Sequence, residues 1–517
     1  MWKTDADKRG KFRNLSAYFV EYTRVAEIHG IRFLSRRTAF ERLLWGILTL
    51  CCVLVCLAQI IKLCSRLYKS PVVVTFGTEA VNVYEVPFPA VTICPESKTD
   101  RRRFSYHDSR IKFEKKQPMT DYEQKSYEYI FSICDHLDMS HQTDYFKERY
   151  FDQDFYDTVL NLSITWSTTA IACKWKNTYL DCSQMFTRIF IDEGVCYSFN
   201  ILHRNHIFNN ETFLPDGTFE AFEPKNNWKM ESGYPDKDIL GTYPKRVYTS
   251  GADQALRIYL LERTANFDFD CKSSLQGFRV IIHNPLTVPQ ASQNYFRVSP
   301  DRSFIAAVMP TLIHTAPDVV RFNAASRNCY MELERPLKYF KQYTQDNCWL
   351  ECLSNYTLLR CECVSYYMPR TEDIPICGGY HYHCVLSAQD ELELIEIKNK
   401  LNNKTKSLSF CDCLPSCASL HYEFEVTASV PAWPTLGHRR DDGTALSELI
   451  IYFQHSTFVK LERNEVFSTF DLLAKIGGLF GLCTGASVIT VVELIYYWSG
   501  RIICNVRLFG HWYGQKN

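Results

Sequence analysis

The sequence predicts an α+β membrane protein in which two transmembrane helices flank a large, disulfide-rich extracellular domain. Two segments, 43–63 and 469–498, are apolar and long enough for a helix to cross a bilayer. Sixteen of the 22 cysteines lie between Cys94 and Cys417, in the stretch that separates these segments. An even number of closely spaced cysteines is typical of disulfide bonds formed in an oxidising compartment. We therefore expect residues 64–468 outside the cell, and both termini, 1–42 and 499–517, in the cytosol.

The amino-terminal segment 1–42 carries ten Lys or Arg against five Asp or Glu. By the positive-inside rule these charges hold the amino terminus in the cytosol. The apolar run Leu43–Ile61 follows, and nineteen helical residues rise by roughly 29 Å, which fits a hydrocarbon core. A buried helix of a soluble domain is the alternative, but it needs no arginine flank.

The extracellular segment mixes strand and helix signals. Residues 70–94 alternate β-branched or aromatic residues with polar ones, which predicts strands, whereas the spacing in 121–139 favours a helix. Residues 271–322 are expected to be rich in strands and loops. A helix is predicted from Ser387, capped with Asp390, to Leu401, and strands are predicted over 421–429 and 449–467.

The second apolar segment contains features that a lipid anchor does not need. Asp471, Lys475 and four glycines interrupt it: Gly477, Gly478, Gly481 and Gly485. Glycines at a spacing of four form a stripe along which another backbone can approach, and ordinary association of membrane helices is the simplest interpretation of that stripe.

The triplet Gly485, Ala486 and Ser487, followed by Glu493, indicates more than helix association. Irregular backbone at membrane depth is tolerated only where protein buries it or where it lines water. A carboxylate near that depth costs about 2.5 to 3.5 kcal/mol unless it faces a wet cavity or a partner. Together these residues predict a water-filled pore.

The segment LLAKIGGLFGLCTGASVITVVEL resembles the second transmembrane segment of the degenerin and epithelial sodium channel family, whose selectivity filter is a Gly/Ser-x-Ser triplet. The resemblance extends to FPAVTIC at 88–94 and to the pair His29 and Gly30, which alone would usually be a turn. The stretch ERPLKYFKQYTQDNCWLECLSNYTLLRCEC is most similar to the insect pickpocket branch.

The resemblance implies a sodium-permeable, amiloride-sensitive cation channel of the plasma membrane, gated through its extracellular domain. It implies the palm, finger and thumb architecture of acid-sensing channels, with a thumb-like cysteine block at 329–417. One pore helix per chain cannot enclose an aqueous path, so geometry and resemblance both call for an oligomer, here a homo- or heterotrimer. The alternative is a non-conducting receptor or accessory subunit of a heteromer.

Other classes of protein find little support in the sequence. Lys plus Arg and Asp plus Glu both number 58, so no net charge points to nucleic acid. No nucleophile, metal, phosphate or cofactor motif stands out, which speaks against an enzyme. No residue selects among acid, peptide, small ligand, lipid and mechanical force as the stimulus.

Individual roles follow from the resemblance. Gly485, Ala486 and Ser487 match the filter, and His29 with Gly30 matches a gating motif. Ala474 matches the small residue near the outer gate, within a pore-lining stretch that includes Gly477, Gly478 and Gly481. Glu493 would attract cations below the filter, although a snorkelling or paired carboxylate at a helix end is the alternative. Lys475 stands where many acid-sensing relatives carry aspartate, and it would repel cations unless Asp471 neutralises it.

Disulfides are the favoured interpretation of the extracellular cysteines. A zinc site using His381 and His383 is the weaker alternative, because extracellular thiolates are normally oxidised and no paired Cys-x-x-Cys is present. Spacing does not give the connectivity. The resemblance implies seven pairs and leaves two cysteines, which we expect to pair with each other. The seven are Cys94–Cys196, Cys173–Cys182, Cys329–Cys417, Cys348–Cys413, Cys352–Cys411, Cys361–Cys384 and Cys363–Cys377, and the remaining pair is Cys134–Cys271.

Four Asn-x-Ser/Thr tripeptides lie in the segment predicted to be extracellular. Each is a candidate for N-linked glycosylation, which requires a surface position in the secretory pathway. The four are Asn161, Asn210, Asn355 and Asn403.

Overall fold

The structure is a computed structural model that describes residues 17–34, 38–134, 146–220, 226, 228–235, 242–272, 275–292, 294–401, 410–431 and 443–513. The chain divides into two compact units. The terminal unit combines Met1–Val73 with Asn464–Asn517, and the central unit is Val74–Arg463. Each unit has its own architecture.

The first membrane helix of the terminal unit is α2, Ala39–Lys69. It begins where the Thr38 side chain accepts a hydrogen bond from the amide of Glu41, an ordinary N-cap. It ends at Ser70, just before Pro71, because the residue that precedes a proline is disfavoured in a helix. The helix is therefore longer at both ends than the expected 43–63, and it alone passes for a membrane span among single described helices.

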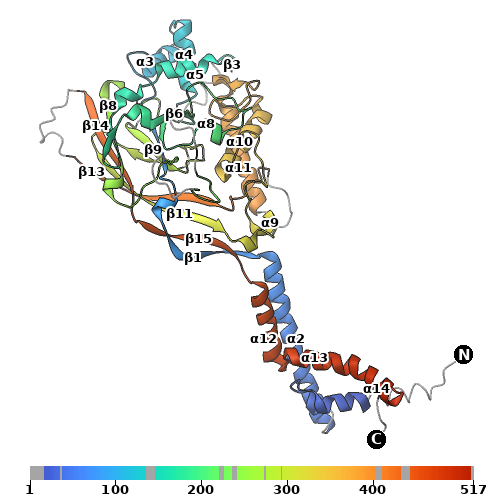
Figure 1. Ribbon diagram of the computed structural model, residues 1–517. Helices are drawn as coiled ribbons and strands as arrows, with labels where there is room; N and C mark the ends of the chain where they lie inside the picture. Colours follow the sequence, from blue (N-terminus) through green and yellow to red (C-terminus); the bar gives the residue numbers. More distant parts are fainter. Residues whose placement is uncertain are drawn as a thin grey trace. The chain divides into compact units, whose positions relative to one another are not determined.

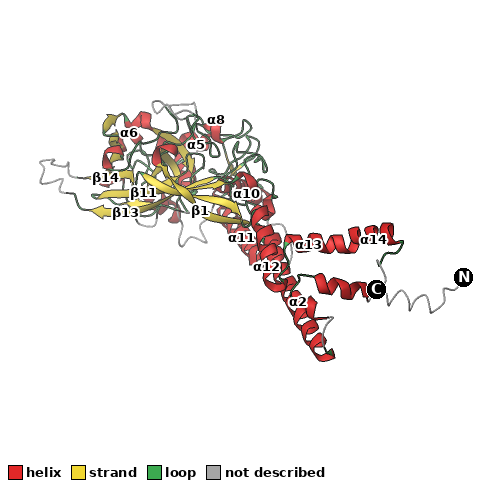
Figure 2. Cartoon of the chain, turned by 60° about the horizontal axis from the view of Figure 1, so that its bottom comes forward, coloured by secondary structure: helices red, strands yellow, loops and turns green. Residues whose placement is uncertain are grey.

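The carboxy-terminal apolar segment is not one helix, so the expectation of a continuous helix over 469–498 is wrong. It consists of α12 (Thr469–Thr484), α13 (Val488–Ile495), the π-helical turn η9 (Tyr496–Gly500) and α14 (Arg501–Phe509). α12 and the stretch Val488–Phe509 are bent by 75° at the break, and they qualify as a second span only if the bent pair is counted as one. α12 packs along α2 (Figures 1 and 2).

The larger sheet of the central unit has eight strands in the order β1-β15-β11-β14-β8-β4-β5, with β13 also paired to β11. β11 is its hub, because it pairs antiparallel with β13 and parallel with β14 and β15. The strands are β1 (Val72–Asn82), β4 (Ala170–Trp175), β5 (Thr178–Leu180), β8 (Leu256–Arg263), β11 (Ser303–Thr315), β13 (Ser419–Ser429), β14 (Thr444–Phe453) and β15 (Thr457–Glu465).

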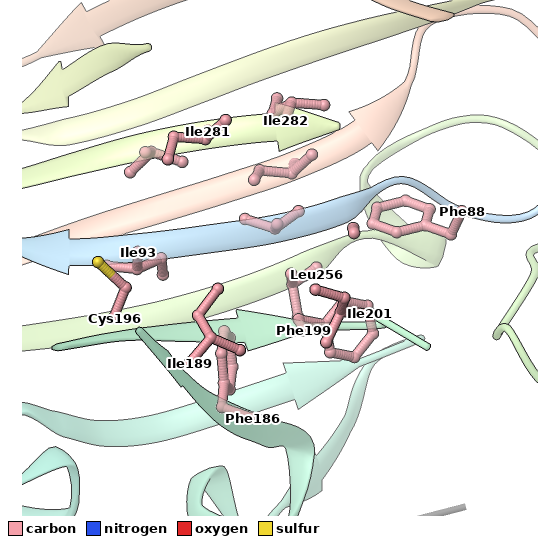
Figure 3. Close-up of a cluster of buried hydrophobic side chains, with 14 of the residues drawn as sticks. Phe88, Ile93, Phe186, Ile189, Cys196, Phe199, Ile201, Leu256, Ile281 and Ile282 are labelled. Atoms are coloured by element: carbon pink, nitrogen blue, oxygen red, sulfur yellow. The ribbon is translucent and has the colours of Figure 1, made fainter. Parts of the chain in front are cut away.

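The second sheet has five strands in the order β10-β9-β2-β7-β6. These are β2 (Ala90–Pro95), β6 (Phe186–Ile191), β7 (Gly194–Phe199), β9 (Phe278–His283) and β10 (Phe296–Val298). Every residue of β2 is buried, as expected for a central strand. Side chains of both sheets form the main hydrophobic core, in which Phe88 and Phe199 lie beside Leu256 of the larger sheet (Figure 3).

Three helices at one end of the central unit enclose a second, aromatic core (Figure 1). They are α3 (Tyr106–Glu114), α4 (Asp121–Phe131) and α5 (Asp154–Leu162). Thr120 caps α4 by accepting a hydrogen bond from the amide of Glu123. All eleven residues of α4 fall within the range 121–139 predicted from spacing to be helical, and its last six residues are all buried.

Helices α10 (Gln345–Cys361) and α11 (Tyr382–Leu401) lie side by side at a flank of the central unit (Figure 1). The predicted start of the second helix at Ser387 is wrong, because the helix begins five residues earlier. Its predicted apolar face is exposed, with Leu394 at 53% and Ile397 at 52%. The buried face carries Ala388 and Leu392 instead, since these residues face α10 and the disulfides.

The remaining elements are short. They are η1 (Ile31–Leu34), η2 (Val83–Glu85), β3 (Tyr150–Phe151), α6 (Trp166–Thr169), α7 (Cys182–Met185), α8 (Arg204–Ile207), η4 (Ala252–Gln254), η5 (Thr264–Asn266), η6 (Pro317–Val319), α9 (Ala324–Arg327), β12 (Ile376–Cys377) and η7 (Gly379–His381).

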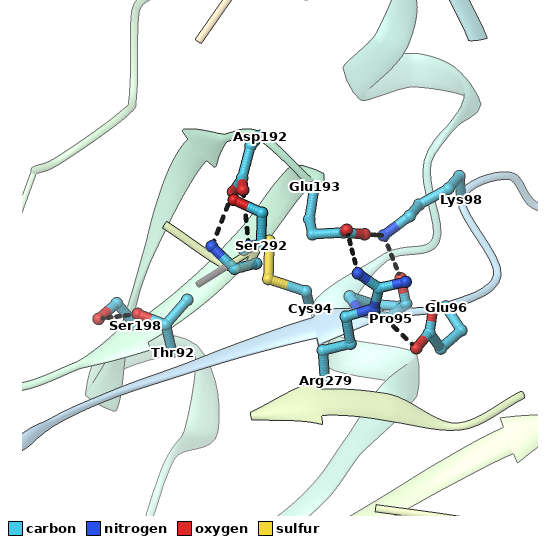
Figure 4. The surroundings of a disulfide bond; sticks show 12 residues. Thr92, Cys94, Pro95, Glu96, Lys98, Asp192, Glu193, Ser198, Arg279 and Ser292 are labelled. Atoms are coloured by element: carbon cyan, nitrogen blue, oxygen red, sulfur yellow. Dashed lines mark hydrogen bonds and ion pairs between the residues drawn. A yellow bond between two sulfur atoms is a disulfide. The ribbon is translucent and has the colours of Figure 1, made fainter. Parts of the chain in front are cut away.

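Eight disulfides join the same cysteine pairs that the resemblance implies, together with Cys134–Cys271. Every cysteine weighed as a zinc ligand is in one of these bonds. Five disulfides fall between Cys329 and Cys417 and tie α10, α11 and the start of β13 together. The bond Cys94–Cys196 lies beside a network of buried charges (Figure 4).

That network stands between the two cores and is almost fully paired. The Glu193 carboxylate accepts hydrogen bonds from Lys98 at 2.8 Å, Lys272 at 3.2 Å and Arg279 at 2.5 Å. Arg279 also donates to Glu96 at 3.0 Å (Figure 4). Breaking a buried pair leaves an uncompensated charge, so this network commits the central unit to one arrangement.

Candidate functional site

The break between α12 and α13 lies at the triplet Gly485–Ser487. Gly485 ends α12 in the left-handed conformation, with φ +68°, and its amide donates to the carbonyl of Gly481 at 2.9 Å. This is an αL C-cap, which glycine adopts without the steric cost of a Cβ. Sequence spacing placed Gly485 on a helical stripe with Gly477 and Gly481, and the stripe in fact ends one turn earlier.

The backbone at the break leaves two carbonyl groups without partners. No described residue donates a hydrogen bond to the carbonyl oxygen of Gly485 or of Ala486. An unpaired carbonyl in hydrocarbon costs several kcal/mol, so such groups persist at membrane depth only where protein buries them or where they line water.

The next helix begins immediately. The Ser487 hydroxyl accepts a hydrogen bond from the amide of Thr490 at 3.2 Å, and the Ser487 amide donates to the Thr490 hydroxyl at 3.1 Å. This reciprocal cap fixes where α13 starts and uses the Ser487 hydroxyl within the chain. The oxygens left over at the break are therefore those of the backbone.

His29, from the amino-terminal segment of the chain, contacts the backbone at the break. Its amide donates to the carbonyl of Thr484 at 3.0 Å, the residue before the triplet. The His29 ring occupies the space where a Cβ on residue 485 would lie, so Gly485 is required by contact as well as by φ.

The other half of the His-Gly pair meets the first membrane helix. Gly30 has φ +90°, and the Thr49 hydroxyl of α2 fills the position that its Cβ would take. A few residues on, the Phe33 ring stacks on Trp45 of α2 at 4.5 Å between centroids. The pair therefore joins α2 to the break through two contacts in which a glycine meets a side chain of the other segment.

The amino-terminal end of α12 carries the charged residues that the sequence singled out. Asp471 forms a capping box with Ser468, accepting from its amide at 3.1 Å and from its hydroxyl at 2.8 Å. Lys475 lies over the Phe467 ring at 3.6 Å from the centroid and forms no ion pair with Asp471. Asp471 is thus committed to the helix end and does not neutralise Lys475 by direct contact.

Within a single chain, the other predicted residues of this segment are exposed or have free space beside them. Gly477 and Gly478 have no described atom within 4 Å of the position a Cβ would take, and the Gly481 position has only the Ala486 carbonyl oxygen, at 3.8 Å. Ala474 and Glu493 are exposed. These residues are brought onto the same broken helix, but only Gly481 lies against the triplet.

A cluster of aromatic residues that sequence reasoning missed lies beyond α13. Tyr18 and Tyr22, in the helical residues 17–25, pack against Tyr497, and the Tyr18 hydroxyl donates to the Tyr497 carbonyl at 2.6 Å. Glu21 pairs with Arg501. The spacing of Tyr18, Tyr22 and Ala26 at i, i+4 and i+8 was the available signal, since it marks one face of a helix.

Three of the predicted glycosylation residues are exposed on the central unit: Asn161, Asn210 and Asn355. Asn403 lies outside the described residues.

Comparison with known proteins gives a consistent result. A family model described as amiloride-sensitive sodium channel matches residues 22–497. The chain is 25% identical to pickpocket protein 28 of Drosophila melanogaster over 94% of its own length and 79% of that protein. It is 21% identical to the sodium channel protein Nach of the same species, over 94% of the chain and 88% of that protein. Acid-sensing ion channel 1C of Danio rerio is 26% identical over 241 residues, which are 44% of this chain and 42% of that protein.

Proposed function

Because the chain belongs to the amiloride-sensitive sodium channel family, we propose that it is a pore-forming subunit of a trimeric, sodium-permeable channel that amiloride blocks. Membership makes it a cation channel subunit of the plasma membrane, as the resemblance to the pickpocket branch predicted. Sodium preference, amiloride block, trimeric assembly and gating through the extracellular domain are the proposed part.

One observation carries the proposal: two carbonyls at the break of the carboxy-terminal span have no partner among the described residues. Three copies of the chain would bring six such oxygens around one axis. Carbonyl and hydroxyl oxygens can replace part of the water shell of a dehydrated cation. We assign Gly485, Ala486 and Ser487 to this filter, with His29 and Gly30 holding it in place.

The residues on either side of the filter take the roles of entrance and exit. Ala474 is the small residue of the outer gate, where the exposed Cβ leaves room for a neighbouring helix. Glu493 lies on the cytosolic side and attracts cations leaving the filter. Lys475 repels cations at the outer mouth, and the Asp471 carboxylate, which is held in its cap without an ion pair to Lys475, offsets that repulsion only in part.

The signal reaches the pore through continuous backbone. β15 runs to Glu465, and Ser468 caps α12 three residues later, so a displacement of the strand is passed directly to the helix. The helices α10 and α11, which disulfides link, form a stiff part of the central unit, and we identify this part as the thumb. With both ends of the chain in the cytosol, the glycosylation residues face the exterior.

Expression of this chain alone in a cell without related subunits tests the proposal. We expect a sodium current that amiloride blocks, under a stimulus applied outside the cell. A chain that reaches the surface, carries no current alone and restores current when co-expressed with a relative would instead be an accessory subunit. The Asn161→Gln variant checks, through the loss of one glycan, that this part of the chain enters the secretory pathway, and surface biotinylation measures delivery to the cell surface.

A further inference from the structure

A cavity of about 430 Å³ in the central unit lies between α10, the loop that follows β9, and the start of β13. Cavities of this size accommodate compact organic ligands. No residue assigned to the pore lines it. Its walls include Ile281 and Ile282, which lie in β9 (Figure 3).

The loop that follows β9 lines the cavity, and hydrogen bonds hold it to α10 on one side and to β13 on the other. The Asn347 side chain of α10 accepts from the Val288 amide at 3.1 Å and donates to the Leu286 carbonyl at 3.3 Å. On the other side, the Asn284 side chain donates to the Leu420 carbonyl of β13 at 3.1 Å. The cavity is therefore a preformed site that needs little ordering when a ligand binds.

The charge of the cavity is negative. Glu231, Glu332, Asp346 and Glu423 line it, and no Lys or Arg does so among the described residues. None of these four carboxylates forms an ion pair with a described residue. Although Asp346 is exposed, desolvation by its surroundings raises its pKa, so a positive charge placed beside the carboxylate would be favourable.

The two histidines of the wall do not reverse this charge. His283 shares hydrogen bonds with the Thr92 hydroxyl at 2.8 Å and with the Asn284 carbonyl at 2.9 Å, and burial lowers its pKa to about 4. It is therefore neutral at physiological pH. His421 is exposed and near enough to Asp346 to interact with its charge.

The carboxylates are too dispersed for a metal ion. No three His, Cys, Asp or Glu side chains of the described residues converge as metal ligands would. Apolar and aromatic side chains separate the acids instead, among them Leu286, Val288 and Tyr343. The Tyr343 ring is held in place because its hydroxyl donates to the Leu414 carbonyl at 2.5 Å. This combination suits an organic cation with an apolar body, and an aromatic wall adds to its binding.

The cavity wall is also connected to the strand that enters the pore helix. Ser419 of β13, which lines the cavity, is opposite Ile313 of β11, and Ile313 is opposite Leu461 of β15. Two steps across one sheet therefore link the cavity to β15. A ligand that favours one position of β13 would shift the equilibrium of the gate by its differential affinity.

We propose that this cavity binds a small organic monocation with an aromatic or aliphatic body, of the arylalkylamine class, and that its occupancy biases channel gating. The gating clause rests on the proposed function, whereas the binding clause does not.

The test measures binding of phenethylamine to the purified full-length chain in lipid nanodiscs by calorimetry, with 2-phenylethanol as the neutral analogue of similar shape. We expect saturable binding of the amine and at least ten-fold weaker binding of the alcohol. The double variant Asp346→Asn with Glu423→Gln should weaken amine binding at least ten-fold. Glu425→Gln, an exposed carboxylate two residues along β13 that does not line the cavity, is the matched control and should bind as the unmodified chain does.

Glu332→Gln alone, on a separate segment, should weaken binding by a smaller factor and keeps the test decisive if the double variant fails to fold. Equal binding of amine and alcohol, equal loss in Glu425→Gln, or displacement of the amine by millimolar calcium through the same carboxylates would overturn the proposal. Because binding is read without current, a chain that binds the amine but never conducts contradicts the proposed function and leaves the site standing.

Discussion

The two units of the chain hold themselves together in opposite ways. The central unit carries all eight disulfides, two large hydrophobic cores and a paired network of buried charges. The terminal unit has six free cysteines, few buried side chains and a carboxy-terminal apolar segment whose helix is interrupted at Gly485–Ser487. The contrast teaches that disulfides and buried ion pairs are concentrated in the central unit, and irregular backbone within an apolar helix in the terminal unit.

The largest expected effect concerns Gly485, a position of the terminal unit with no room for a side chain. Gly485→Ala should reduce current at least a hundred-fold, because the added Cβ meets the His29 ring. Gly510→Ala is the matched control, since Gly510 has nearly the same φ, +67°, and open space around it. Whole-cell current normalised to surface protein checks the pair. Equal losses would mean that backbone strain alone, about 1 kcal/mol, explains both.

A disulfide of the central unit should have the next largest effect. The double variant Cys352→Ser with Cys411→Ser opens a loop with a sequence separation of 59, which costs about 2 to 5 kcal/mol. We expect most of the chain to be retained inside the cell, as measured by surface biotinylation. Cys504→Ser, which removes an exposed free thiol of the terminal unit, should leave surface delivery unchanged. If both variants reach the surface alike, the comparison between the units is wrong.

Bulk at the outer gate should have a moderate effect on the terminal unit alone. Ala474→Val should increase the resting current several-fold, because the larger side chain hinders closure of neighbouring pore helices. Resting current blocked by amiloride is the measurement, with Leu473→Val, an exposed neighbour, as the control. An unchanged resting current in protein shown to be at the surface would count against the assigned gate.

The smallest expected effect concerns a single buried acid of the central unit, Glu262, which accepts a hydrogen bond from the Ser97 hydroxyl at 3.1 Å. Burial raises the pKa of Glu262 from about 4.5 to about 8, and one of its oxygens has no hydrogen-bond partner among the described residues. Between these pH values the folded chain keeps a proton that the unfolded chain releases, so the free energy of unfolding falls as pH rises. Glu262→Gln should therefore raise Tm at pH 8 and leave it unchanged near pH 5. The same Tm shift at both pH values would exclude titration of Glu262 as the cause.

Much of the fold was predictable from residue patterns, but the decisive part of the site was not. Apolar length predicted α2, alternation predicted β1 and β2, and the family pattern of cysteines implied the disulfide pairs. The start of α11 was predicted too late because the Ser387 and Asp390 pattern, which is typical of a helix N-cap, lies here inside the helix. Its exposed Leu394 was misjudged because disulfides, not periodicity, decide which face of α11 is buried.

The geometry of the break required three-dimensional information. The residues Gly485 to Ser487 were identified from their motif, but a small-residue stripe does not reveal where a helix stops. The stop depends on His29, more than 450 residues away, and on the reciprocal cap between Ser487 and Thr490. Likewise, the four carboxylates of the cavity come from four separate segments, so no local pattern joins them.

The most direct measurement is the accessibility of position 487 during conduction. In a chain carrying Ser487→Cys, a small cationic thiol reagent applied while the channel is open should block the sodium current irreversibly. The same reagent should not affect Leu482→Cys, a highly exposed position on α12 before the break. Block at Ser487→Cys alone is the result we predict. A conducting Ser487→Cys channel that the reagent leaves unchanged would contradict the assignment of the break to the ion pathway.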